Sequence, residues 1–162
     1  MTATTFIHTS DFQLGMTRWF LKGEAQGRFN DDREAAIVRL GELAEETGAE
    51  FIVVAGDVFE HNALSREILA RATEMFKRLP VPVYVLPGNH DPLVADSVFY
   101  KASADNVHVI ADSEPIEVAP GVELVGAPYL SKRANHDLVR QALEPLGPAA
   151  GLSLIHISAP TR

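Results

Sequence analysis

Two stretches of consecutive apolar residues constrain the fold of this chain most strongly: FIVVA at residues 51–55 and VPVYVL at residues 81–86. A strand with water on one face alternates apolar and polar side chains. A short run without that alternation is typical of a strand buried on both faces, as in a parallel sheet covered by other layers. The shorter segment Phe6–Thr9, which begins with apolar residues and ends in polar ones, is a candidate for a third strand.

The segments between these strands have helical spacing. Asp31–Thr47 opens with acidic residues, repeats apolar residues on one face and can end at Gly48. Leu64–Leu79 has a similar apolar face, and Pro80 stops it. Alternating strands and helices predict an α/β fold with a βαβαβ core, a parallel sheet and right-handed crossovers. Met16–Phe29 has no clean period and is predicted to be an irregular loop.

The pattern changes after Pro92, where short apolar segments follow one another closely. The strands predicted here are Val107–Ile110, Ile116–Val118, Val122–Gly126 and Leu152–Ile157, with a helix over Lys132–Leu146. We interpret residues 1–151 as the N-terminal part of one domain. Residues 152–162 are interpreted as a doubtful tail, either foreign sequence or a truncated strand.

The composition of the chain limits the kinds of binding and metal sites that it can form. The chain is 46% hydrophobic and 22% charged, as expected of a soluble globular protein, and no apolar run has membrane-spanning length. It contains no cysteine, which excludes disulfides and thiolate ligands and fits a cytoplasmic location. The net charge of −8 argues against a basic nucleic-acid-binding module. Carboxylates that hold cations are compatible with that charge, because bound metal ions can receive a phosphate.

A polar cluster follows each of the first three strands. The clusters are Asp11-Phe12-Gln13, Gly56-Asp57-Val58-Phe59-Glu60 and Gly88-Asn89-His90-Asp91. Because the carboxyl ends of parallel strands share one sheet edge, the clusters are expected to meet there. Each Asp alone could be a helix cap or a turn former. Three such clusters in series instead predict a pair of divalent cations that could clamp a phosphate.

These clusters resemble the first three motifs of the calcineurin-like metallophosphoesterases. HTSDFQLG at residues 8–15, followed by GDVFE at 56–60, more closely resembles the DNA-repair exonuclease branch that contains the SbcD nuclease subunit. The resemblance covers about residues 5–130. It implies a metallophosphoesterase sandwich of two mixed sheets flanked by helices, and a hydrolase that cleaves phosphodiester bonds.

The resemblance also implies a role for each residue of the motifs. Asp11 would bind the first metal ion, Asp57 would bridge the two ions, and Asn89 would bind the second. His90 would donate a hydrogen bond or proton near the leaving group, and Asp91 would orient His90. The expected cofactors are two divalent ions, with Mn²⁺ favoured and Mg²⁺, Fe and Zn²⁺ as alternatives.

Two departures from the family pattern affect the metal site. Gln13 stands where the first motif usually has His, so we hypothesise that it is a ligand or lies just behind one. An amide oxygen is a poorer ligand than imidazole, which predicts weaker binding or a harder ion at the first position. The family's Gly-His-x-His element is missing, and His156 is the only candidate for a fourth motif. A structural role for His156 is the alternative. The absence of the later elements that the family has predicts a C-terminally truncated copy.

Arg18 and Lys22 follow the first motif, with Trp19 between them, and are predicted to bind substrate. An ordinary amphipathic segment is the alternative.

The favoured function is a DNA exonuclease or endonuclease subunit in DNA repair, with DNA as substrate, an SbcC-like ATPase as partner, and a homodimer as the assembly. One alternative is a phosphodiesterase or phosphatase for a small or lipid-linked phosphate. Another is an inactive fragment that lacks the later metal ligands.

Overall fold

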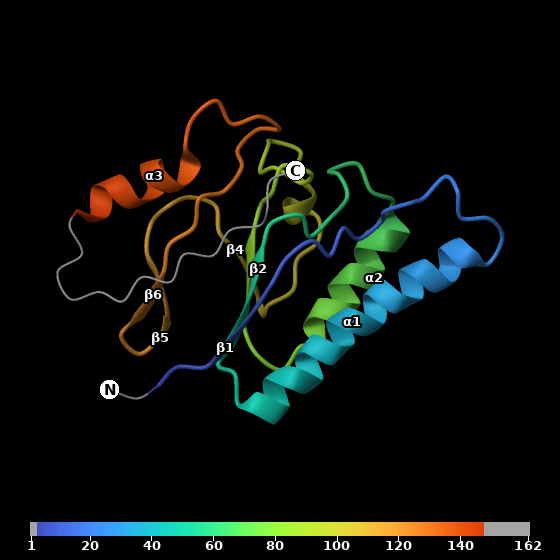
Figure 1. Cartoon of the computed structure of the whole chain (residues 1–162), viewed down its shortest axis with the longest axis horizontal. Coiled ribbons are helices and arrows are strands. Elements are labelled where there is room, and N and C mark those ends of the chain that lie inside the picture. The colour runs from blue at the N-terminus through green and yellow to red at the C-terminus, as the bar shows by residue number, and fades with distance from the viewer. Residues whose placement is uncertain (1–2, 148–162) are drawn as a thin grey trace.

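A computed structural model describes residues 3–147 and contains two sheets (Figure 1). The larger sheet has four parallel strands in the order β1-β2-β3-β4. Its strands are β1 (Phe6–Thr9), β2 (Phe51–Ala55), β3 (Val83–Leu86) and β4 (Val107–Val109). The register pairs Phe6 with Phe51 and Ile52 with Val83. The predicted parallel βαβαβ core is therefore confirmed.

Two helices cover one face of this sheet: α1 (Ala25–Thr47) and α2 (Arg66–Lys77) (Figure 1). Right-handed crossovers between strands in sequential order bring successive helices to the same face. The core between the helices and the sheet contains Ile37 of α1, Phe76 of α2, and Ile52 and Val54 of β2. This layer positions the strand ends that carry the polar clusters.

The other face packs against an antiparallel pair, β5 (Ile116–Ala119) and β6 (Val122–Leu124). Phe51, Val53, Tyr84 and Ile110 form the apolar cluster on this side. Alternate residues of β2 thus enter different cores, which explains why FIVVA has no polar position. The predicted two-sheet sandwich is confirmed. Within residues 3–147, however, one sheet is purely parallel and the other purely antiparallel, rather than both being mixed.

Two helices differ by more than two residues from their predicted bounds, whereas α2 is two residues shorter at each end than the predicted Leu64–Leu79. α1 begins at Ala25 instead of Asp31, so the predicted loop Met16–Phe29 ends earlier. Its first turn is tied down by Gln26, whose amide accepts from the backbone of Arg18 and donates to that of Met16. This tie has no apolar periodicity, so the sequence pattern could not reveal it.

The predicted helix Lys132–Leu146 is shorter in the structure. It consists of α3 (Leu138–Leu143) followed by the 3-10 helix η2 (Glu144–Leu146), and Asp137 caps α3 by accepting from the backbone N–H of Arg140. Another 3-10 helix, η1 (Val98–Tyr100), follows the third polar cluster. The predicted strand Leu152–Ile157 and the tail 152–162 lie outside the described residues. Among residues 3–147, no helix is long and apolar enough to cross a membrane.

Candidate active site

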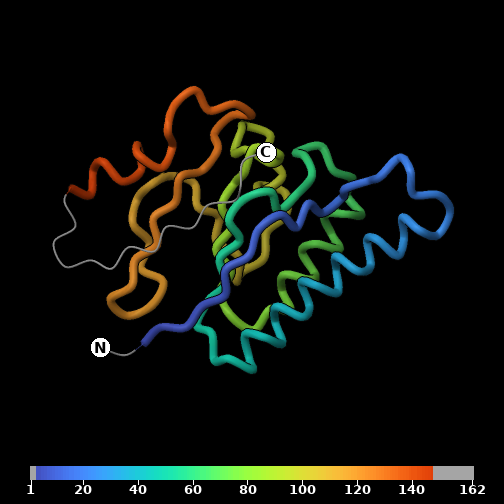
Figure 2. The backbone as a smooth tube through the Cα atoms, viewed as in Figure 1, coloured from blue at the N-terminus to red at the C-terminus, as the bar shows by residue number. Residues whose placement is uncertain are grey.

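Three loops meet at the carboxyl edge of the parallel sheet: loop 1 (residues 10–16), loop 2 (56–63) and loop 3 (87–92). Loops 1 and 2 run side by side after their strands end, as the backbone trace shows (Figure 2). Backbone hydrogen bonds join Asp11 N to Gly56 O at 3.1 Å and Gln13 N to Asp57 O at 2.9 Å. Leu14 then bonds to Val58 O and accepts from Glu60 N. The first two polar clusters are therefore linked through their main chains.

Three residues of these loops have an uncommon backbone conformation. Asp11, Gln13 and Asp57 have φ angles of 57°, 44° and 54°, in the left-handed region. They are the only non-glycine residues with positive φ in the part of the chain that the structure describes. Such conformations are unfavourable for most side chains and concentrate at functional sites. All three were predicted as metal ligands, so backbone strain and the predicted chemistry coincide.

Asp57 is the most buried of the predicted ligands that the structure describes, with 8% of its surface exposed. One carboxylate oxygen, Oδ1, accepts the backbone N–H of His90 at 3.1 Å and so joins loop 2 to loop 3. Gly88 passes so close that a β-carbon there would collide with this oxygen and with the Asp57 backbone nitrogen. Loop 3 can approach the carboxylate only because residue 88 has no side chain.

The Asp91 carboxylate is fully buried and bonds to two loops. It accepts the backbone N–H of Phe59 at 2.9 Å and that of Gly88 at 2.8 Å. Burial raises the pKa of Asp91 to about 6, against the effect of these hydrogen bonds. Asp91 was expected to orient His90. In the structure its carboxylate bonds to main-chain groups and so joins loops 2 and 3, and its action on His90 stays a prediction.

The residue that contacts the His90 ring is Glu60. The ring Nδ1 lies 3.1 Å from the carbonyl oxygen of Glu60 and 3.8 Å from its carboxylate Oε2. From the sequence, Glu60, the last residue of the GDVFE motif, was expected either to lie just behind a metal ligand or to cap the segment that follows. The sequence feature that could indicate this contact is the position of Glu60 in the motif, because it places Glu60 at the same sheet edge as His90.

Comparison with known proteins identifies the family to which these three loops belong. Residues 4–135 match the calcineurin-like phosphoesterase family, a span that includes all three loops. The chain belongs to the calcineurin-like phosphoesterases. The fold and the family resemblance predicted from the motifs are thereby confirmed, and the family supports phosphoester hydrolysis as the general chemistry.

Two curated relatives of this phosphoesterase show how far the similarity extends. The chain is 32% identical over 98 residues to the DNA double-strand break repair protein Mre11 of Archaeoglobus fulgidus, covering 59% of this chain and 21% of that protein. It is 27% identical over 123 residues to the uncharacterized metallophosphoesterase YhaO of Bacillus subtilis, covering 72% of this chain and 30% of that protein. The match therefore spans less than a third of either relative.

The donor atoms of the phosphoesterase loops suit hard cations in their chemistry. Asp11 and Asp57 provide carboxylates, and Gln13 and Asn89 provide amide oxygens. Asp11 and Asn89 are exposed, and the Ser10 hydroxyl donates to the Asp11 carboxylate. Within residues 3–147, no three His, Asp or Glu side chains are grouped closely enough to hold an ion by themselves. The amides of Gln13 and Asn89 would have to contribute. The predicted ligand His156 lies outside the described residues.

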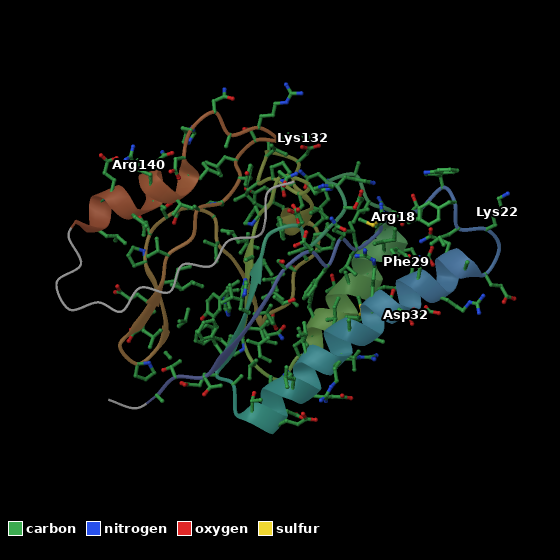
Figure 3. All side chains as sticks on the ribbon, in the orientation of Figure 1. Arg18, Lys22, Phe29, Asp32, Lys132 and Arg140 are labelled. Atoms are coloured by element: carbon green, nitrogen blue, oxygen red, sulfur yellow. The ribbon has the colours of Figure 1, made fainter. Side chains whose placement is uncertain are left out.

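The predicted substrate-binding residues are separated along the segment that leads into α1. Lys22 lies at the outer turn of this segment, whereas Arg18 lies closer to the sheet edge (Figure 3). Between them, Trp19 is 93% exposed and Phe20 is 58% exposed, and their rings meet edge to face. Cationic and aromatic side chains are thus accessible beside loop 1.

Proposed function

We propose that this chain is the metal-binding part of a DNA-cleaving phosphodiesterase that uses two divalent ions, preferably Mn²⁺, in DNA repair. The observation that carries the proposal is the left-handed backbone of Asp11, Gln13 and Asp57 at one sheet edge. The family match supports phosphoester hydrolysis, and the similarity to a double-strand break repair protein supports DNA as the substrate.

In this proposal, the loop residues divide between two ions. Asp11 and Gln13 would hold the first, Asp57 would be shared by both, and Asn89 would hold the second. When bound, such ions polarise a phosphate and lower the pKa of a water molecule that can attack it. The acidic loops then present a positive surface to a polyanion, which reconciles DNA binding with the net charge of −8.

His90 acts on the leaving group in this scheme. With Nδ1–H donating to the Glu60 carbonyl, Nε2 is left free to face the scissile phosphate. In its protonated form the ring also carries a proton on Nε2, which can donate to the departing oxygen or be transferred to it. Asp91 contributes by fixing the backbone of Gly88, two residues before this histidine, and that of Phe59, the residue before Glu60.

Arg18, Lys22 and Trp19 would bind the DNA strand beside the metal site. The cations would contact phosphates, and the exposed indole would stack on a base. Trp19 is the only tryptophan in the chain, so its fluorescence reports on this segment alone. Quenching by a DNA oligonucleotide is expected, and Arg18→Gln with Lys22→Gln should flatten its salt dependence. Unchanged fluorescence at saturating DNA would remove this segment from the substrate path.

The principal test is a Mn²⁺-dependent hydrolysis assay that compares linear DNA with bis-p-nitrophenyl phosphate. We expect cleavage of the DNA, and we expect Asp57→Asn to lower the rate by about a hundredfold or more. Asp32→Asn, an exposed carboxylate change on α1, is the matched control and should leave the rate unchanged. Metal-dependent cleavage of the small diester alone would contradict the nuclease assignment and retain the family chemistry.

A small-molecule phosphodiesterase is the second candidate, favoured by the acidic charge of the chain, which repels a polyanion in the absence of metal. The same substrate comparison separates it from the nuclease. The nuclease proposal also includes an SbcC-like ATPase and a second copy of the chain as partners. Light scattering of the purified chain, alone and with such an ATPase, tests both associations.

A further inference from the structure

The helix α1 directs one arginine toward loop 1. Arg33 Nη1 donates to the carbonyl oxygen of Phe12, Nη2 contacts Met16 Sδ at 3.4 Å, and the guanidinium lies 4.6 Å from the centre of the Phe29 ring. Phe12 is the residue between Asp11 and Gln13, both of which have a left-handed backbone. The guanidinium therefore holds the main chain between two strained residues.

Two other arginines of the helical layer, Arg39 and Arg71, pair with carboxylates instead. Arg39 on the same helix pairs with Glu46 at 2.7 Å and with Glu42 at 3.0 Å, and all three side chains are more than half exposed. Arg33 has no carboxylate partner within salt-bridge distance among residues 3–147 and bonds to a main-chain oxygen instead. Its position is thus specific to the loop and is not that of a solvated surface charge.

The electrostatic surroundings of Arg33 also belong to the site. Burial and the nearby charge of Arg18 lower the pKa of Arg33, while Glu60 and Asp11 act in the opposite direction. Two buried polar side-chain atoms have no hydrogen-bond partner in the described part of the chain: Arg33 Nε and Glu60 Oε2. A cationic donor and an anionic acceptor thus both retain bonding capacity beside loops 1 and 2.

We propose that Arg33 is a positioning residue that keeps loop 1 in its metal-binding conformation. The inference rests on the proposed metal site, because it explains how Asp11 and Gln13 are held ready for an ion. Without the guanidinium, the peptide of Phe12 loses its side-chain donor and the strained backbone on either side can relax. A weak amide ligand such as Gln13 depends strongly on being held in place before the ion arrives.

The first test needs no metal. Arg33→Met removes the donor and keeps the apolar stem, and hydrogen exchange of the Asp11, Gln13 and Leu14 amides is followed by NMR on the full chain. These amides bond to loop 2, so exchange about tenfold faster or more is expected in the variant. Arg39→Met is the matched control on the same helix and should not change the rates. Unchanged exchange in Arg33→Met overturns the proposal.

The second test measures Mn²⁺ binding by electron paramagnetic resonance. Arg33→Met should bind the ion about tenfold more weakly, and Arg33→Lys, whose ammonium can still donate to Phe12, should be intermediate. Equal affinity for the wild type and Arg33→Met contradicts the proposal. If the wild type itself binds no Mn²⁺, the proposed function fails, whereas the exchange experiment still judges Arg33.

The conservative variant Arg33→Lys distinguishes a general folding defect from a local effect on loop 1. If Arg33→Met does not fold, the same two measurements are made on Arg33→Lys. We then expect a folded chain with faster exchange and weaker Mn²⁺ binding than the wild type. Arg33→Lys that is unfolded, or that matches the wild type in both measurements, means that Arg33 does not position loop 1.

Discussion

The interior of the parallel sheet and its carboxyl edge are built in opposite ways. In the interior, β2 buries apolar side chains on both faces within a regular parallel ladder. At the edge, three non-glycine residues adopt left-handed backbone and a carboxylate is fully buried. The interior contributes stability through apolar burial, whereas the edge retains strain and buried charge that burial elsewhere must offset. Substitutions in the two regions should therefore have different consequences.

The largest expected effect lies in the core between α2 and the sheet. Phe76→Ala empties a site where the ring is buried in that core and also packs against Phe12 of loop 1 and Phe59 of loop 2. It should lower the free energy of unfolding by about 3–5 kcal/mol, measured by urea denaturation. Val38→Ala, at a half-exposed position of α1, is the control and should change stability little. A loss below 1 kcal/mol would mean that the helical layer is not the main source of stability.

At the edge, Asp91→Asn should be the most destabilising conservative change. It keeps the shape of the side chain but turns one acceptor into an amide N–H₂ that faces a backbone N–H, from Phe59 or Gly88. The loss should be about 1.5–3 kcal/mol in a thermal or urea unfolding measurement. Asp112→Asn in an exposed turn serves as the comparison. Equal stability of the two variants would show that the buried carboxylate does not join the loops.

A smaller effect is expected where the sequence departs from its family. Gln13→His restores the imidazole that the first motif usually has, and imidazole is the stronger ligand for transition metals. Mn²⁺ affinity should rise by about tenfold, measured by calorimetry or by paramagnetic resonance. The hypothesis that Gln13 lies at or beside the first ion fails if both affinity and rate stay at wild-type values.

The smallest expected effect comes from placing glycine at a strained position of loop 1 and at an unstrained position of α1. Gln13→Gly relieves a left-handed backbone and should stabilise the chain by about 1 kcal/mol while weakening metal binding. Ala36→Gly introduces glycine at an exposed position of the regular helix α1, where the backbone is unstrained, and should destabilise the chain by a similar amount. Thermal unfolding of both variants measures the sign of each change in stability. If both substitutions destabilise the chain, loop 1 is not strained at this position.

The two regions also differ in how far the sequence predicts them. FIVVA could be placed in a buried parallel strand because Ile52 and Val54 face one core and Phe51 and Val53 face the other, which leaves no polar position among them. Asp57 and Gly88 could be placed at one edge because parallel strands end together. The start of α1 could not be predicted, because it depends on the side-chain bonds of Gln26 rather than on apolar spacing.

Contacts between distant side chains at the edge were the least predictable feature. The sequence placed His90 and Asp91 in one motif and suggested that they interact, yet the structure pairs His90 with Glu60 and Asp91 with the loop backbones. Arg33 carried no signal, because its bond to Phe12 joins the middle of a helix to a loop far away in sequence. Such bonds depend on the packed arrangement of the elements, which local patterns do not encode.

The backbone ladder between loops 1 and 2 has a consequence for how the domain assembles. Asp11 bonds to Gly56 and Gln13 to Asp57, although the whole of α1 lies between these partners in the chain. Closing such long-range parallel contacts carries an entropic cost that is recovered only when the intervening helix has docked. The site therefore cannot form in a partly folded chain. Any ion that prefers the assembled loops would act as a ligand of the folded state and stabilise the domain as a whole.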